Sequence, residues 1–220
     1  MQAEVLAHGS DIGLIVRNGR LVTVEAVGEP PTQIFGNDPM RVFGADLEFI
    51  AADSVVGVEE PGFATADSAV LGQTIGFTHL RALRRWNAVA GAFESTSFTM
   101  TAGRTDVGLA NVTTPTSDTP TPITPIANFP DDMHYLWTLD QATSANGEGI
   151  YLVEGIFTNP VVGGNGLASS EPVWFVFNYG LDEEDHDAAI GYVESTLVPT
   201  PGAAIIGALG LGAAARRRRR

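Results

Sequence analysis

Four histidines are the side chains of this sequence that are best suited to bind a metal ion. Because the 220 residues include no cysteine, thiolate ligands and cysteine nucleophiles are excluded. If proteolysis makes His8 the first residue of the mature chain, its α-amine and its ring nitrogen can chelate a metal ion together. His134 or His186 would complete an imidazole-rich site of the kind that copper prefers. The first chemical hypothesis is therefore a copper site in which His8 is joined by one of these two histidines.

The same histidines also have structural interpretations, which remain open alternatives. His8 would then be a frayed terminal residue, His186 a polar position on an exposed helix turn, and His134 the start of a strand. His79 lies inside a strand-like segment, so we expect it to be semi-buried with its hydrogen bonds satisfied. Under this interpretation none of the four binds a metal.

Carboxylates form three local groups. The first is Glu59-Glu60, and the second is Asp131-Asp132, just before His134. Either pair could flank a sugar as general acid and base, but the separation of the two carboxylates in space decides that chemistry. The third group, between Asp182 and Asp187, is dense enough to attract calcium but lacks the alternating Asp-x-Asp-x-Asp-Gly loop of an EF-hand. A solvated helix start explains this third group, so calcium stays a secondary hypothesis.

No catalytic signature accompanies these residues. The sequence has no Gly-x-Ser-x-Gly motif that would present a serine nucleophile. The glycine-rich stretch 163–166 has no lysine and opens no helix, so it does not match a phosphate-binding loop. We therefore expect a protein that is not an enzyme and that requires no cofactor.

Aromatic residues suggest a binding role as an alternative. Exposed tryptophan and tyrosine rings can stack on the faces of sugars. Trp137 and Trp174 lie within apolar strand-like segments, so we expect them in the core. Trp86 follows two arginines and precedes Asn87, which makes it the best candidate for an exposed ring. A carbohydrate-binding module with extracellular polysaccharide as its partner is thus a second hypothesis.

The charge of the chain excludes one class of partner. Acidic residues number 26 and basic residues 12, and five of the basic residues are the C-terminal arginines 216–220. No lysine is present, and the remaining arginines form no basic stripe that could contact phosphates. We therefore expect no binding of nucleic acid.

Alternating hydrophobicity predicts a mainly β protein. The strand-like segments are 11–16, 21–26, 41–50, 74–80, 93–101, 134–139, 150–157 and 173–178. Asn18-Gly19 between the first two is a strong signal for a two-residue hairpin turn. Many short strands with few helices favour an antiparallel β-sandwich, of which a jelly roll is the expected variant.

Two segments depart from the strand pattern. Residues 113–130 contain six threonines and five prolines, so we expect a long loop that protrudes from one domain spanning residues 8–197. Residues 182–197 form the one short C-terminal helix of the body, with Asp182 as its N-cap. Ala189, Ile190, Val193 and Leu197 form its apolar stripe.

The C-terminal residues 198–220 have the form of a sorting signal. Fourteen residues from Gly202 to Ala215 carry no charge, and they are followed by the membrane stop Arg216, Arg217, Arg218, Arg219 and Arg220. A helix of fourteen residues is about 21 Å long, which is short for a permanent span of a hydrocarbon core about 30 Å thick. We expect a hydrophobic sorting helix that anchors the chain in the membrane transiently and is then removed.

This end resembles the PEP-CTERM family of bacterial sorting signals, which exosortase-type membrane proteases recognise on exported proteins. The motif is Val198, Pro199, Thr200 and Pro201, with threonine where the family most often has glutamate. The resemblance implies an exosortase-type protease and the export machinery as partners. It also implies a location at the bacterial cell surface, in the extracellular matrix or outside the cell.

The body is also similar to an uncharacterised β-rich group of PEP-CTERM proteins, a likeness that implies a surface or secreted protein of unknown activity. The similar segments are 8–12, 18–23, 60–63, 75–77 with 85–87, 149–152, 172–178 and 184–190. For an exported protein, residues 1–7 are expected to be the remnant of a signal peptide, so that the mature chain begins at His8.

Overall fold

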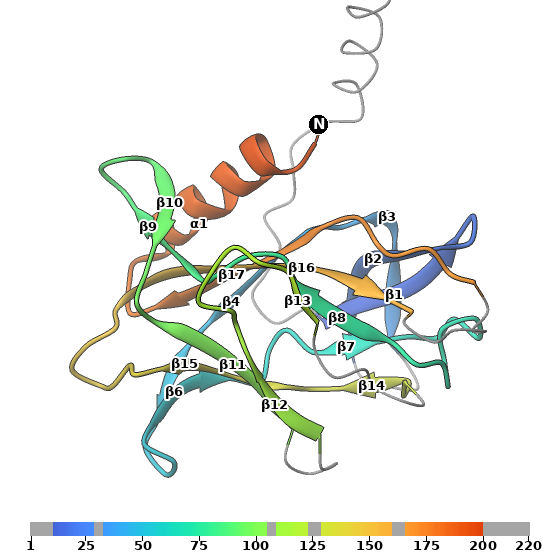
Figure 1. Cartoon of the computed structure of the whole chain (residues 1–220), viewed down its shortest axis with the longest axis horizontal. Helices are drawn as coiled ribbons and strands as arrows, with labels where there is room; N and C mark the ends of the chain where they lie inside the picture. Colours follow the sequence, from blue (N-terminus) through green and yellow to red (C-terminus); the bar gives the residue numbers. More distant parts are fainter. Residues whose placement is uncertain (1–10, 29–32, 105–108, 123–128, 160–165, 200–220) are drawn as a thin grey trace, which may run out of the picture.

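Strands dominate the protein (Figure 1). The computed structural model describes residues 11–28, 33–104, 109–122, 129–159 and 166–199. Within these residues the strands form three sheets, and the chain has one α-helix, α1 (Glu183–Tyr192), which continues into the π-helical turn η1 (Val193–Leu197). The prediction of a mainly β protein with one short C-terminal helix in the body is confirmed.

The first sheet contains the N-terminal hairpin. Its spatial order is β14 (Asp132–Met133), β7 (Phe63–Ala64), β1 (Asp11–Arg17), β2 (Arg20–Val27) and β3 (Ile34–Pro39). Asn18 and Gly19 have φ angles of 51° and 73° and connect β1 to β2 as the predicted two-residue turn. β7 pairs with β1 in parallel and with β14 in antiparallel orientation.

The second sheet is built on the long strand β16. Its main path is β10 (Ala92–Ser95), β9 (Arg84–Asn87), β16 (Gly149–Thr158), β17 (Val173–Tyr179) and β4 (Val42–Asp46). One edge of β16 pairs first with β9 and then with β8 (Gly76–His79), and β8 also pairs with β13 (Thr121–Pro122). β17 and β4 are parallel.

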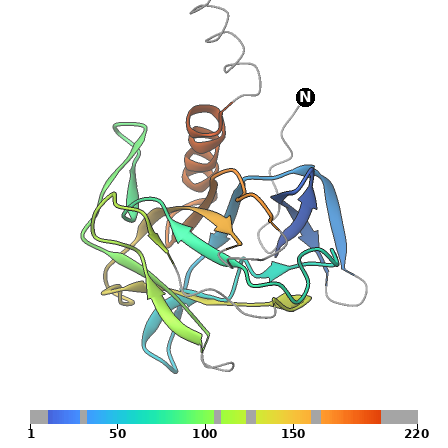
Figure 2. The same cartoon turned by 45° about the vertical axis from the view of Figure 1, so that its right-hand side comes forward.

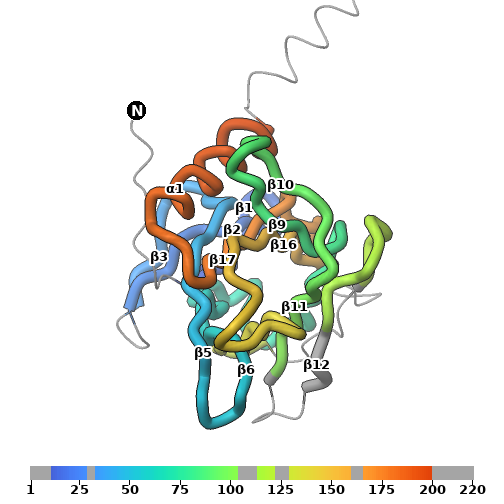
Figure 3. Tube along the Cα trace, turned by 90° about the vertical axis from the view of Figure 1, so that its left-hand side faces the viewer, coloured from blue at the N-terminus to red at the C-terminus, as the bar shows by residue number. Residues whose placement is uncertain are grey.

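The third sheet has the order β12 (Leu109–Thr113), β11 (Thr99–Arg104), β15 (Leu136–Asp140), β6 (Val55–Val58) and β5 (Glu48–Ile50). Its β5–β6 hairpin projects at the opposite end of the molecule from α1 (Figure 3).

Two strands that the sequence predicted as continuous are interrupted. The segment 41–50 divides into β4 and β5, which belong to different sheets, and the segment 93–101 divides into β10 and β11. Leu47 lies at the first break, where its side chain is buried and its amide donates to Asn178 O. Periodicity alone did not reveal these breaks, because strand-like residues lie on both sides of each change of sheet.

β17 is buried on both faces. Phe175 and Phe177 belong to the larger core cluster, together with Phe63, Phe77 and Trp137. The alternate residues of β17, Trp174 and Val176, face a second cluster. This cluster also contains Ala189 of α1 and Val193 of η1, two residues of the predicted apolar stripe. Figure 2 shows α1 standing over this side of the sheets. The continuous hydrophobicity of β17 therefore reflects a strand between two layers.

The helix begins where the sequence predicted, but Asp182 does not cap its N-terminus with its side chain. Asp182 makes no side-chain capping hydrogen bond. Its backbone carbonyl instead accepts hydrogen bonds from the amides of Asp185 and His186. The acidic residues of the first turn still lie where the helix dipole favours negative charge.

Several predicted segments lie partly or wholly outside the described residues. These are the signal-peptide remnant 1–7, part of the predicted loop 113–130, and the hydrophobic helix of the C-terminal signal. In the described part of that loop, β13 adds a short edge strand to β8. No helix in the described ranges combines the length and apolar composition needed to cross a membrane.

His79 lies in a more apolar environment than the sequence suggested. Its side chain is 0% exposed, its ring lies edge-on to that of Phe77, and neither ring nitrogen has a hydrogen-bond partner among the described residues. Burial lowers the pKa of His79 from 6.5 to about 4. The folded protein therefore keeps this imidazole neutral over a pH range in which the unfolded chain protonates it.

The substitution His79→Leu should change the pH dependence of stability. Between pH 6.5 and 4 the unfolded wild-type chain binds a proton that the folded chain does not, so its free energy of unfolding falls as the pH drops. The variant lacks this effect, and its stability relative to the wild type should rise by about 3 kcal/mol over that range. Urea denaturation at a series of pH values measures the difference. A difference that is independent of pH would contradict the neutral, buried state of His79.

Candidate metal centre

Three adjacent strands of the first sheet bring Asp11, Gly62 and His134 into one row. The paired residues of β1, β7 and β14 are Ile12, Phe63 and Met133. Asp11 directly precedes Ile12, and Gly62 directly precedes Phe63, because β1 and β7 run parallel. His134 directly follows Met133, because β14 runs antiparallel to β7. Asp132 precedes His134 by two residues and so shares its face of the strand. The pairing of β14, β7 and β1 therefore gathers side chains that are far apart in the sequence.

Gly62 leaves the space in which the other two residues of the row meet. A Cβ at this position would lie 2.9 Å from His134 Nδ1 and closer still to Asp11 Oδ1. The glycine amide donates hydrogen bonds to Asp11 Oδ1 and to Glu60 Oε2, each at 3.0 Å. A residue without a side chain is required here because of this close approach and not because of its φ angle.

Carboxylates surround the imidazole of His134. Its Nδ1 lies 3.5 Å from Glu60 Oε1, and its Nε2 lies 3.6 Å from Asp132 Oδ2. One ligand atom each from Asp11, Asp132 and His134 lies within 4.8 Å of the other two. Asp132 Oδ1 is buried without a hydrogen-bond donor among the described residues. The carboxylates around His134 thus offer more hydrogen-bond acceptors than the described donors nearby can satisfy.

Asp11 is the most enclosed member of the group, with 6% of its surface exposed. Gln33 Nε2 donates to its Oδ2 at 3.1 Å, and the Gly62 amide donates to its Oδ1. These two donors fix the orientation of the carboxylate toward His134.

The electrostatics of the site reflect this crowding. Burial raises the pKa of Asp11 to about 7, and the negative charge of Glu60 adds to the increase. Burial lowers the pKa of His134, but the nearby carboxylates, those of Asp11 and Glu60 foremost, outweigh this effect and raise it. Without a cation, the site must therefore hold protons that ordinary carboxyl groups release at neutral pH.

This arrangement is suited to binding a divalent cation. Zinc binds imidazole nitrogen and carboxylate oxygen at about 2.0–2.2 Å, so one ion fits between donor atoms separated by 3.6 Å. Asp11, Asp132 and His134 would supply three ligands, and Glu60 lies on the Nδ1 side of the imidazole as a further negative charge. A ligand set of one imidazole and several carboxylates favours zinc or manganese over copper, for which an imidazole-rich site is expected.

The structure brings together two of the acidic groups that the sequence singled out. Glu60 and Asp132 lie on two sides of His134, although 72 positions separate them in the chain. Sequence reasoning missed Asp11 and Gly62. The only signal for Asp11 was its position three residues after His8, which itself lies outside the described residues.

His186 lies in a separate group of residues from His134. Its neighbours are Asp46 of β4 and Glu183 of α1, and each contributes a ligand atom within 4.8 Å of the other two. His134 and His186 therefore lie beside different carboxylates, because β14 belongs to the first sheet whereas α1 covers the second.

Trp86 is half-buried on β9. Its ring lies 5.2 Å from that of Phe93 and 5.4 Å from that of Tyr192, and both pairs are tilted by nearly 60°. These rings form a corner between the β9–β10 hairpin and α1, and they do not form a flat strip. Trp86 also borders an open hollow of about 500 Å³ whose lining is largely polar.

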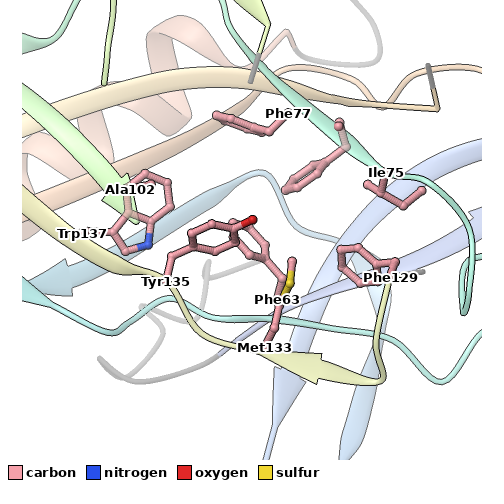
Figure 4. A pocket seen from close by; sticks show the side chains of 10 residues that line it. Phe63, Ile75, Phe77, Ala102, Phe129, Met133, Tyr135 and Trp137 are labelled. Atoms are coloured by element: carbon pink, nitrogen blue, oxygen red, sulfur yellow. The ribbon is translucent and has the colours of Figure 1, made fainter. Parts of the chain in front are cut away.

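A small apolar cavity lies among the aromatic side chains of the core (Figure 4). Its volume is about 20 Å³, close to the space of one water molecule. The side chains that enclose it are apolar or aromatic and include Phe63, Ile75, Phe77, Phe129, Met133 and Trp137. A cavity of this size and lining holds no polar ligand.

The predicted sorting motif begins directly after the last helical turn. Val198 is extended, and its amide donates to Val193 O at 3.0 Å. Pro199 is exposed. The other sorting residues, Thr200 and Pro201, and the membrane stop, arginines 216–220, lie outside the described residues.

No protein-family model, curated protein or solved structure matches this chain in comparisons of sequence and fold. The geometry of the site therefore has to be interpreted from its own residues.

The substitution Gly62→Ala should destabilise the metal-free protein. The added methyl group would push Asp11 away from His134, and overpacking of this kind costs about 1–3 kcal/mol. Urea denaturation in the presence of a chelator measures the loss. Gly191→Ala is the matched control, because no atom lies within 4 Å of the added Cβ and helix propensity predicts a gain of up to about 1 kcal/mol. An unchanged midpoint for Gly62→Ala would show that the three strands do not converge as described.

Proposed function

We propose that this protein binds a divalent metal ion, with zinc or manganese as the preferred class, through Asp11, Asp132 and His134. The observation that carries the proposal is the convergence of these three donor groups within 4.8 Å beside Gly62, at the start of β7. Glu60 lies 3.5 Å from Nδ1 of the same imidazole, on the side away from Asp132. The function is the binding of the ion by a β-rich body, in keeping with the sequence, which contains no catalytic signature.

The electrostatic cost of the metal-free site supports this proposal. Three carboxylates and an imidazole lie close together, and Asp11 is almost fully buried. Bringing like charges into a poorly solvated place is unfavourable unless protons or a cation neutralise them. A divalent cation would neutralise them and could also satisfy the buried acceptor atom Oδ1 of Asp132.

The site supports metal binding better than sugar hydrolysis. Asp11 receives an amide hydrogen bond from Gly62 and an amide hydrogen bond from Gln33, and its small exposure leaves little room for a sugar ring. Carbohydrate binding at the hollow beside Trp86 remains an alternative proposal, supported by the polar lining of that hollow.

We further propose that the body is delivered to the bacterial cell surface or the extracellular matrix by the signal of residues 198–220. In this proposal an exosortase-type protease removes the tail after the arginine stop has halted it in the membrane. The body itself would be a jelly-roll-like β-sandwich, carried outside the cell after transient anchoring. The exposed position of Pro199 after η1 supports access of a protease to the motif.

Metal binding can be tested by titrating the full chain with Zn²⁺ in a calorimeter. The double variant Asp132→Asn/His134→Gln should bind one equivalent of Zn²⁺ fewer than the wild type, because two of the three ligands are gone. Asp131→Asn is the matched control, since it removes a charge from the exposed neighbouring residue without changing the ligand set. Equal stoichiometry for the double variant and the wild type would rule the site out.

Sorting can be tested in a bacterium that contains an exosortase. The full chain behind a cleavable signal peptide should be recovered without residues 202–220, and Pro199→Ala should leave the tail attached. Thr200→Glu, which restores the residue most common in PEP-CTERM signals, should remain processed. Mass spectrometry of the secreted and membrane fractions distinguishes these products. Recovery of the intact mass from the surface of the exosortase-containing strain would oppose the proposal.

A further inference from the structure

His186 is an unusually well-oriented imidazole at the contact between α1 and the second sheet. Its side chain is 0% exposed, and its Nε2 lies 3.0 Å from Val176 O of β17. A carbonyl oxygen can only accept a hydrogen bond, so Nε2 must carry the proton. In the neutral ring, Nδ1 therefore presents its lone pair on the opposite side.

That lone pair is directed toward carboxylates. Nδ1 lies 3.8 Å from Asp46 Oδ1, and Glu183 is placed three residues before His186, on the same face of α1. Donor atoms of the three residues lie within 4.8 Å of one another. An imidazole lone pair and two carboxylate oxygens can all serve as ligands of one cation, so their convergence is suited to binding a positive ion.

The position of Asp46 is fixed by the strands and not by the helix. Asp46 pairs with Asn178 across β4 and β17, and Asn178 Nδ2 donates to Asp46 Oδ1 at 3.0 Å. The same amide group is bound to the backbone of Leu181, at the turn that leads into α1. These hydrogen bonds fix the position of the Asp46 carboxylate relative to the start of α1 before any ligand binds.

Gly44 allows the helix to approach this closely. A Cβ at Gly44 would lie 3.0 Å from Ile190 Cδ1 and 3.4 Å from His186 Cε1. Asp46 is 45% exposed, so the site is closed on the side of His186 and open to water on the side of the carboxylates. Water can complete the coordination of an ion there.

We propose a second divalent-metal site, formed by Asp46, Glu183 and His186, that joins α1 to the edge strand β4. The ligand class is a first-row divalent cation such as Zn²⁺, which accepts one imidazole nitrogen, two carboxylate oxygens and water. The hydrogen bond from Nε2 to a backbone carbonyl is the arrangement that orients metal-binding histidines. This site shares no residue with the one at Asp11, so the two proposals are independent.

The test uses the full chain with the first site removed by Asp132→Asn/His134→Gln. Zn²⁺ should still bind to this background, and adding Asp46→Asn/Glu183→Gln should weaken that binding by at least about tenfold. The matched control adds Glu184→Gln/Asp187→Asn instead, which removes the same charge from exposed acidic residues of α1 outside the ligand set. The control should bind Zn²⁺ as the background does.

A second measurement avoids any effect of these substitutions on folding. Nitrogen NMR of the histidine rings in the otherwise unaltered chain should show a Zn²⁺-induced change at Nδ1 of His186, with Nε2 still protonated. Three results would overturn the proposal: an equal loss in the control, no binding in the background, or a His186 ring protonated on both nitrogens and indifferent to Zn²⁺. The last result would identify a simple ion pair with Asp46. Because the background lacks the first site, none of these results depends on that site.

Discussion

The alignment of β14, β7 and β1 is the constraint on which the rest of the functional geometry depends. It places Asp11, Gly62 and His134 in one row, and the missing side chain of Gly62 lets the flanking residues meet. The row sits at the rim of the aromatic core, because Phe63, the residue after Gly62, packs its ring against those of Tyr135, Trp137, Phe157 and Phe175. The polar site is therefore held by a rigid apolar base, and the strands cannot shift to relieve the crowding of carboxylates.

A similar arrangement of a histidine, a carboxylate and a glycine lies where α1 covers the second sheet. There β17 is covered by α1, and the contact buries His186 beside Asp46. In both places a buried or half-buried histidine lies close to a carboxylate from another strand, Asp11 of β1 or Asp46 of β4, and a glycine provides the room. The excess of acidic over basic residues in the chain gives both places a negative surrounding, which favours the approach of cations.

The sequence predicted local features better than the meeting of distant residues. The hairpin at Asn18-Gly19 and the helix from residue 183 follow from local chemistry, so they could be located from spacing alone. The division of segment 41–50 between two sheets depends on long-range pairing and left no periodic signal. Likewise, the acidic pairs near residues 60 and 132 were visible as candidates, but only the strand register shows that they share one histidine. Asp11 and Gly62 could not be chosen from the sequence, because their role arises from the pairing of β1 with β7.

The position of the bound ion, at the start of β7, is the most direct test of the metal site. Crystals of the full chain grown with Zn²⁺ should give an anomalous scattering peak, above the zinc absorption edge, between Asp11, Asp132 and His134. We expect bonds of about 2.0–2.2 Å from that peak to these side chains. A well-ordered structure in which Zn²⁺ occupies other positions, while these three side chains keep their metal-free arrangement, would contradict it.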